Sequence, residues 1–427
     1  MSLLPGEKLD FSDSANKEPE HLLPQQINDK YTRGEVRIVT EQARYPLSTI
    51  VTMLDSGDYK LQPEFQRRHR WDVHRQSSLI ESFIMNVPIP PIFLYEVEYS
   101  RYEVMDGLQR LTAIANFYKG EYALEGLDQW SELNGLRYPD LPEQVRRGID
   151  RRYLSSIILL QETAATKGEE HRLKRLVFER INSGGEQLEP QESRNALYDG
   201  DFNRLCIKLA RTESFCRMWG IPTAASLGGP SVAQQSLLLE EEDYVGGEEA
   251  LPEFSRVPGE VPPETQRNEL YRTMQDVELV LRFFAFRQIE QVEQGRMRDF
   301  FDEYLRRGNE FGAELLGELA DAFTRTSDLV YEVLGDEAFF VLRPRANAQD
   351  GWVVFERPAK SAYDPIMSAF GEHLEQSGRL IERATCVRDR LKALYREQAE
   401  VFKGRFNKED IRRRNELVSE LLTNVLT

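Results

Sequence analysis

The spacing of apolar residues changes along the chain, and each change marks a predicted element. From Val36 the pattern becomes regular and predicts a short strand and then a helix that ends near Gly57. Asp72 is a good N-cap for a second helix. That helix stops at 87-VPIPP-91, because proline cannot continue a helix. Between the two helices, 61-LQPEFQRRHRW-71 contains a proline and aromatic residues and is predicted to be extended.

Strand-forming residues are concentrated in three later segments. Ile92–Glu98 and Tyr102–Met105 can pair as a hairpin, and Ser155–Gln161 is predicted to be a third strand. Directly after Met105 the apolar spacing lengthens from two residues to about 3.6, which is the spacing of a helix. The sequence therefore predicts a strand that passes straight into a helix.

Helical patterns dominate the second half of the chain. A helix with apolar residues from Leu173 to Ile181 stops at 182-NSGG-185, and Pro190 opens the next. Beyond about residue 200 strand signals nearly vanish, and helices are predicted at 267–292, 297–305, 313–334 and 374–426. The predicted fold class is α+β, with a small mixed sheet and helices followed by a mainly helical region. The predicted parts are a mobile arm at 1–35, a first domain at 36–200, and a helical domain at 201–427 with an acidic loop at 221–266.

Composition and charge narrow the class of protein. Of the 427 residues 40% are hydrophobic, yet no apolar run approaches the roughly 18 residues that cross a bilayer. The N-terminus lacks the apolar region of a secretory signal, and the three cysteines lack disulfide or metal-site spacing, so a cytoplasmic protein is expected. The net charge of −17 argues against a protein that simply coats nucleic acid. This charge is uneven, because residues 240–264 contain nine acids and one base, whereas residues 388–414 contain ten bases and five acids.

The segment 102-YEVMDGLQRLTAIANFY-118 places polar residues where the predicted strand meets the helix. The first N–H groups of a helix lack backbone partners and attract phosphate. Gly107 lets a ligand approach the backbone, Gln109 offers an amide, and Arg110 can fork onto phosphate oxygens. The carboxylate of Asp106 would repel phosphate. Next to a bound polyphosphate it would therefore hold Mg²⁺ or a sugar hydroxyl. The alternative, that Asp106 is only an N-cap and Arg110 only a surface residue, stays open.

Two other segments have residues of a similar kind. In 66-QRRHRW-71 the basic residues beside Trp71 can grip phosphates and stack on a base, or they form an exposed basic edge. In 178-FERINSGGEQL-188 the glycine turn can line a cleft, or it only ends a helix. No complete nucleophilic triad, P-loop lysine motif or His-Glu-x-x-His motif occurs in the sequence.

Four segments together resemble one family. They are PEFQRRHRW, LIESFIMNVPIPPIFL, VMDGLQRLTAI and FERINSGGEQL. Across residues 45–200 the sequence resembles the ParB-like domain of the GmrS/GmrD N-terminal family, also called domain of unknown function 262. The resemblance implies a ParB- or sulfiredoxin-like fold that binds and hydrolyses nucleoside triphosphate in a prokaryotic restriction-type defence system. The helical remainder resembles the tail of members that lack a fused nuclease domain.

The resemblance also implies site residues. Its D-G-x-Q-R signature falls on Asp106, Gly107, Gln109 and Arg110; Asp106, Gln109 and Arg110 are the implied catalytic residues, and Asp106 is also the implied metal ligand. The other implied nucleotide-binding residues are Gln66, Arg67, Arg70, Trp71, Arg180, Asn182, Gly184 and Gly185. Leu108 replaces the first amide of the usual D-G-Q-Q-R, so any contact made by that glutamine is absent.

Three hypotheses about function follow. The first is a protein that binds and hydrolyses a nucleoside triphosphate with Mg²⁺ in an anti-phage defence system and acts on or senses DNA. The second is a nucleotide-gated DNA-binding module without catalysis, which contacts DNA through the basic C-terminal helices. The third is DNA nicking by the ParB-like domain, for which the sequence contains no evident metal-dependent nuclease cluster. In fused members of the family a C-terminal nuclease of the His-Asn-His type cleaves the DNA, whereas His373 is the only histidine after His171 in this chain. DNA cleavage by this chain alone is therefore not expected. A separate effector or nuclease subunit is a further expected partner.

Overall fold

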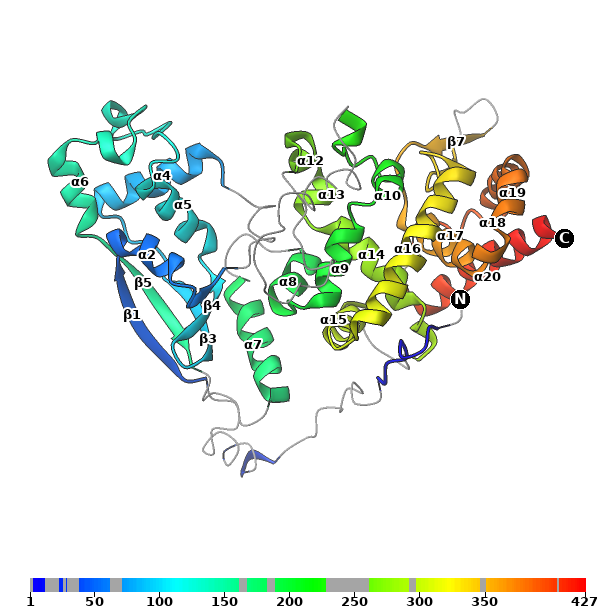
Figure 1. The fold of residues 1–427 in the computed structure, drawn as a ribbon, viewed down its shortest axis with the longest axis horizontal. Helices are drawn as coiled ribbons and strands as arrows, with labels where there is room; N and C mark the ends of the chain where they lie inside the picture. The colour runs from blue at the N-terminus through cyan, green and yellow to red at the C-terminus, as the bar shows by residue number, and fades with distance from the viewer. Residues whose placement is uncertain are drawn as a thin grey trace, which may run out of the picture. The chain divides into compact units, whose positions relative to one another are not determined.

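The computed structural model describes most of the chain, in two compact units. The described residues are 3–11, 23–25, 28, 38–61, 71–160, 167–182, 189–227, 261–291, 297–345, 351–404 and 407–427. The first unit, here called the sheet unit, is Glu18–Leu197. The second, the helical unit, combines Met1–Lys17 with Tyr198–Thr427. Figure 1 shows the larger sheet in the N-terminal part of the chain and mostly helices in the remainder.

The sheet unit contains a five-stranded mixed sheet in the order β1-β5-β3-β4-β2. β3 and β4 form the predicted antiparallel hairpin, β5 runs parallel to β3 and antiparallel to β1, and β2 runs parallel to β4. The strands are β1 (Thr40–Pro46), β2 (Tyr59–Lys60), β3 (Ile92–Glu98), β4 (Arg101–Asp106) and β5 (Tyr153–Leu159). The predicted small mixed sheet is therefore confirmed.

Helices cover both faces of this sheet. Alternate strand residues point to opposite faces, so Leu94 and Ile158 join a core with α2, α4, α5 and α6, whereas Tyr95 and Met105 join a second core with α7. The helices are α2 (Ile50–Asp55), α4 (Val73–Met85), α5 (Leu108–Tyr118), α6 (Glu143–Asp150), α7 (Lys167–Asn182) and α8 (Pro190–Leu197), with short 3-10 turns at Leu47–Thr49, Ser131–Leu133 and Tyr138–Asp140.

The predicted start and stop of α4 are confirmed. Asp72 is the N-cap, and its side chain accepts a hydrogen bond from the backbone N of Arg75 at 2.8 Å. The helix ends at Met85, and Asn86 takes a left-handed conformation with φ of 60°. The prolines that follow lead the chain directly into β3.

The helical unit confirms the predicted helical character of the C-terminal region. Its elements are α9 (Asp201–Leu209), α10 (Glu213–Met218), α12 (Pro263–Arg267), α13 (Glu269–Arg272), α14 (Gln275–Phe286), α15 (Met297–Gly308), α16 (Ala313–Leu334), β6 (Val341–Pro344), β7 (Trp352–Phe355), α17 (Lys360–Glu372), α18 (Ser377–Glu382), α19 (Ala384–Glu397) and α20 (Lys408–Leu426), with 3-10 turns at Ala225–Leu227, Ile289–Gln291 and Leu374–Gln376. None of the helices in the described ranges is long and apolar enough to cross a membrane. Residues 228–260 of the predicted acidic loop lie outside the described residues.

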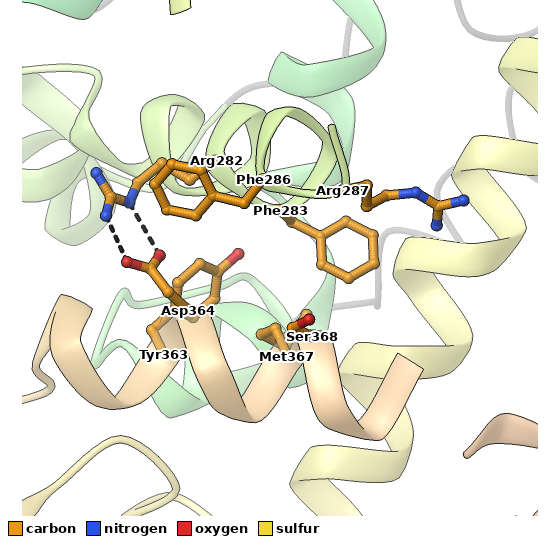
Figure 2. Close-up of a pocket in the computed structure, with 8 residues that line it drawn as sticks. All are labelled: Arg282, Phe283, Phe286, Arg287, Tyr363, Asp364, Met367 and Ser368. Atoms are coloured by element: carbon orange, nitrogen blue, oxygen red, sulfur yellow. Dashed lines mark hydrogen bonds and ion pairs between the residues drawn. The ribbon is translucent and has the colours of Figure 1, made fainter. Parts of the chain in front are cut away.

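A buried ion pair joins α14 to α17 in the core of this unit. Arg282 donates from Nε to Asp364 at 3.0 Å and from Nη2 to the other carboxylate oxygen (Figure 2). Burial by itself would lower the pKa of Arg282, but the Asp364 carboxylate outweighs burial and raises it, so the guanidinium stays charged. The adjoining cavity holds only about 10 Å³, which has room for about one water molecule. This part of the core therefore serves packing and is too small for a ligand.

The elements of the helical unit that the sequence-based prediction missed include three between residues 341 and 372. β6, β7 and α17 lie in a region where no regular element was predicted. The two strands have only four residues each, and β6 contains Arg343 and Pro344. α17 contains Pro365 in its interior. Short strands and an internal proline both suppress the periodic signal on which such predictions depend.

The first described residues of the chain pack on the helical unit. Glu7 is fully buried, and its carboxylate accepts from Arg287 Nη2 at 2.7 Å and from the backbone N of Leu4 at 2.8 Å. Gln288 donates to the Glu7 carbonyl at 2.7 Å and accepts from the backbone N of Leu9 at 2.9 Å. Residues 3–11 of the predicted N-terminal arm are therefore anchored by contacts with residues about 280 positions away.

Replacing Glu7 by alanine is expected to destabilise the helical unit by about 3–5 kcal/mol, because Arg287 loses its buried carboxylate partner. Chemical denaturation of the full chain, with hydrogen exchange to locate the change, measures the effect. The matched control is Glu400→Ala, which removes an 81% exposed carboxylate of the same unit and should change stability by less than about 0.5 kcal/mol. A loss below about 1 kcal/mol for Glu7→Ala would show that the segment does not anchor the unit.

Candidate nucleotide-binding turn

The turn between β4 and α5 depends on one glycine. β4 ends at Asp106, α5 begins at Leu108, and Gly107 between them has a φ of +94°. A Cβ at this position would collide with the side chain of Ile92, which is fully buried at the start of β3. Gly107 occupies the N-cap position and has no side chain that could accept from the N–H groups of the first helical turn. The strand therefore turns sharply into a helix whose start lacks a side-chain cap.

Arg110 and Asp106 form an ion pair within this turn. Arg110 Nη2 lies 2.5 Å from Asp106 Oδ2, and Arg110 Nη1 donates to the Pro90 carbonyl at 2.5 Å. The Arg110 side chain is 12% exposed and that of Asp106 is 36% exposed. Arg110 is thus not the plain surface residue of the alternative interpretation, and Asp106 precedes the N-cap position. The pair holds a fork-shaped donor and a solvent-accessible carboxylate at the helix start.

Gln109 connects this turn to the end of the basic segment. Gln109 Oε1 accepts from the backbone N of Trp71 at 3.2 Å, and Gln76 Nε2 donates to the Trp71 carbonyl at 2.8 Å. The guanidinium of Arg75 lies 4.8 Å from the centre of the Trp71 ring. Trp71 is therefore held through its backbone by α5 and α4, and one face of its ring is covered by a cation.

The other predicted site residues are only partly described. Gln66, Arg67, Arg70, Gly184 and Gly185 lie outside the described residues, as does the side chain of Asn182. Arg180 is exposed near the end of α7, the helix that packs on the opposite face of the sheet from α5. Lys174 fixes α7 to β4 through Glu103 at 2.5 Å. The structure thus brings together Asp106, Gly107, Gln109, Arg110 and Trp71, and places Arg180 on a separate element.

Four further residues shape the turn and were missed by the sequence-based prediction. They are Arg75, Gln76, Pro90 and Ile92. Arg75 and Gln76 follow Trp71 by four and five residues, and this closeness in the sequence is the one signal that could have indicated them. The Pro90 carbonyl and the Ile92 side chain contribute through tertiary contacts, for which the sequence contains no local signal.

Metal ligands are sparse in the part of the chain that the structure describes. Within it, no group of three or more histidine, cysteine, aspartate or glutamate side chains could hold a metal ion. Asp106 offers one solvent-accessible carboxylate at the turn. Mg²⁺ usually takes one or two carboxylates and completes its shell with substrate phosphates and water, so a single carboxylate fits that mode of binding.

Comparison with known protein families concerns the segment that contains this turn. Residues 47–198 match the model of the GmrSD restriction endonuclease, N-terminal domain. The GmrSD-type domain therefore contains β3, β4, α5 and α7, and the resemblance seen in the sequence is confirmed. The match covers just over a third of the chain and leaves almost the whole helical unit outside it. No curated protein and no solved structure matches the chain.

Proposed function

We propose that the chain binds a nucleoside triphosphate with Mg²⁺ at the β4–α5 turn and hydrolyses it, as part of a prokaryotic anti-phage, restriction-type system that acts on or senses DNA. The observation that carries the proposal is the nearly buried Arg110 fork at a helix start without a side-chain cap. Such a helix start attracts phosphate, and an arginine fork matches its oxygens. The GmrSD-type domain match supports the restriction context.

Each residue of the turn has a role in this proposal. Arg110 and Arg67 hold phosphates, Asp106 holds the metal ion or the ribose, and Gly107 admits the ligand to the backbone. For Arg110 to fork onto a phosphate, its Nη2 group has to leave Asp106. This exchange frees the Asp106 carboxylate, which can then bind a cation that accompanies the phosphates.

Phosphate release is the experiment that tests turnover. The full chain is assayed with ATP, GTP and CTP, with and without DNA, and nucleotide affinity is measured on the same samples. Binding together with phosphate release supports the proposal. Binding without release in any condition would reduce the function to a nucleotide-gated module, an outcome that the leucine at position 108 makes worth testing. Absence of binding to all three nucleotides would refute both.

Substitution of Gln109 separates two roles for its amide. If Gln109 positions Trp71, Gln109→Glu keeps an acceptor for the Trp71 N–H and should retain nucleotide affinity, whereas Gln109→Leu should weaken it about tenfold, the effect of one lost hydrogen bond. If Gln109 instead orients the attacking water, both variants should bind normally and lose turnover. Affinity and phosphate release, measured side by side, distinguish the two roles.

Four basic residues of the C-terminal helices are engaged within the fold. Arg388 donates to the Val333 carbonyl at 2.7 Å, and the Arg414 side chain is fully buried. Arg412 and Arg413 both pair with Glu416. Part of the positive charge of residues 388–414 is thus neutralised or buried within the fold. The charge available to a partner is therefore smaller than the count of basic and acidic residues indicates.

A further inference from the structure

The β6–β7 hairpin has no covering layer on part of its surface. Its strands pair antiparallel, with Arg343 opposite Val353, and the pairing continues to Arg345, whose N donates to the Gly351 carbonyl at 2.9 Å. Val354 is 44% exposed and Phe355 is 38% exposed. Because consecutive strand residues point to opposite faces, each face of this short ribbon has one large apolar side chain open to solvent.

Positive charge is grouped on the same ribbon. Arg343, Arg345 and Arg357 are exposed, and none of the three pairs with a carboxylate among the described residues. The Arg343 guanidinium lies 4.1 Å from the centre of the Phe355 ring. Glu356 is the one acid in the described part of the hairpin. In a chain with a net charge of −17, three arginines that have no carboxylate partner among the described residues form a local cationic surface beside exposed apolar residues.

The neighbouring helix extends this surface. α19 lies against β6, and Figure 1 labels α19 and β7, the strand that pairs with β6, in the C-terminal part of the chain. Arg390 and Lys392 are exposed on α19, next to the exposed Asp389. The ribbon and α19 together therefore present more positive than negative side chains.

We infer that the β6–β7 hairpin is a contact surface for duplex DNA. A two-stranded ribbon fits the major groove, which is about 12 Å wide, and a four-residue strand is about 13 Å long. Arg345 and Arg357 then reach phosphates, whereas Phe355, which lies on the same face of the ribbon as Arg343, faces base edges such as thymine methyl groups. The inference rests on the proposed function only for DNA as a partner. It assigns the DNA contact to the helical unit, which contains none of the residues of the nucleotide-binding turn.

Salt dependence of DNA binding tests the inference. The full chain is titrated onto a fluorescent duplex of about 30 base pairs between about 50 and 200 mM salt. Loss of two phosphate contacts in the double variant Arg345→Ala, Arg357→Ala should flatten the slope of log K against log salt by about 2. The matched control is Arg267→Ala, Arg272→Ala, which removes two exposed arginines of the same unit outside the hairpin and should leave the slope unchanged. Phe355→Ala should weaken binding severalfold with an unaltered slope, because it removes apolar contact and no charge.

Three outcomes would overturn the inference. The first is no binding to duplex at about 50 mM salt, and the second is equal loss of slope in the hairpin and control variants. The third is a hairpin variant that converts an oligomer to a monomer without changing DNA affinity, since the ribbon would then bind a second copy of the chain. Nucleotide affinity of the hairpin variants is measured in parallel. Normal nucleotide binding with defective DNA binding supports the inference, and a failure of nucleotide binding in the unaltered chain counts against the proposed function alone.

Discussion

Arg110→Ala is expected to abolish nucleotide binding and to leave the sheet unit folded. The variant removes two charge-assisted hydrogen bonds to phosphate, each worth about 1.5–3 kcal/mol, so affinity should fall by at least about 100-fold. The fold should persist because Asp106 is 36% exposed, so water can replace the lost guanidinium. Calorimetric titration with ATP, GTP and CTP measures affinity, and circular dichroism verifies the fold.

Two variants control for charge and for general disruption. Arg110→Lys keeps the positive charge and loses the fork, so it should bind more weakly than the unaltered chain and better than Arg110→Ala. Arg101→Ala removes a 62% exposed arginine at the start of β4 that pairs only at the surface with Glu98, and should have no effect on nucleotide affinity. Unchanged affinity in a folded Arg110→Ala protein would remove the turn from consideration as the nucleotide site.

The second large effect is expected for Gly107→Ala, which should destabilise the sheet unit by about 2–4 kcal/mol. A positive φ costs a residue with a Cβ about 1 kcal/mol or more, and the collision with buried Ile92 adds about 1–3 kcal/mol. Denaturation of the full chain measures the loss. Hydrogen exchange of peptides from β3 and β4 assigns it to the sheet unit.

Gly57→Ala is the matched control for this prediction. Gly57 also has a positive φ, of +79°, but a Cβ there would meet nothing within 4 Å. Its replacement should therefore cost only the backbone strain, about 1 kcal/mol. If the two variants lost the same stability, the close approach of Gly107 to β3 would not be a constraint on the turn, and backbone strain alone would explain the glycine.

Several features of the sheet unit could be predicted from the sequence because they depend on neighbouring residues. The strand-forming residues in Ile92–Glu98 and Tyr102–Met105 predicted β3 and β4 within a residue, and Asp72 is the N-cap of α4 as expected. The D-G-L-Q-R segment indicated a polar turn between strand and helix, and that turn is confirmed. Its nucleotide stays a prediction.

Contacts between distant residues could not be predicted in this way. Periodicity reports which face of an element is apolar, but it does not report which partner that face meets. The β6–β7 hairpin was missed because each strand is only four residues long and the two strands that pair are separated in the sequence. The N-terminal segment was predicted to be a mobile arm. The contacts that anchor its residues 3–11 were missed because the partners of Glu7 are about 280 residues away in the sequence.

The sequence by itself determined α4, β3, β4 and α5 of the GmrSD-type domain and the identity of its polar turn, because propensity, capping and proline act over a few residues. Only the tertiary structure decided what that turn contacts. Arg110 meets the Pro90 carbonyl and Gln109 meets the Trp71 N–H, since both contacts depend on how α4 and β3 pack beside α5. The physical reason is that a backbone carbonyl or N–H group is the same at every residue, so packing alone selects the one that a side chain reaches.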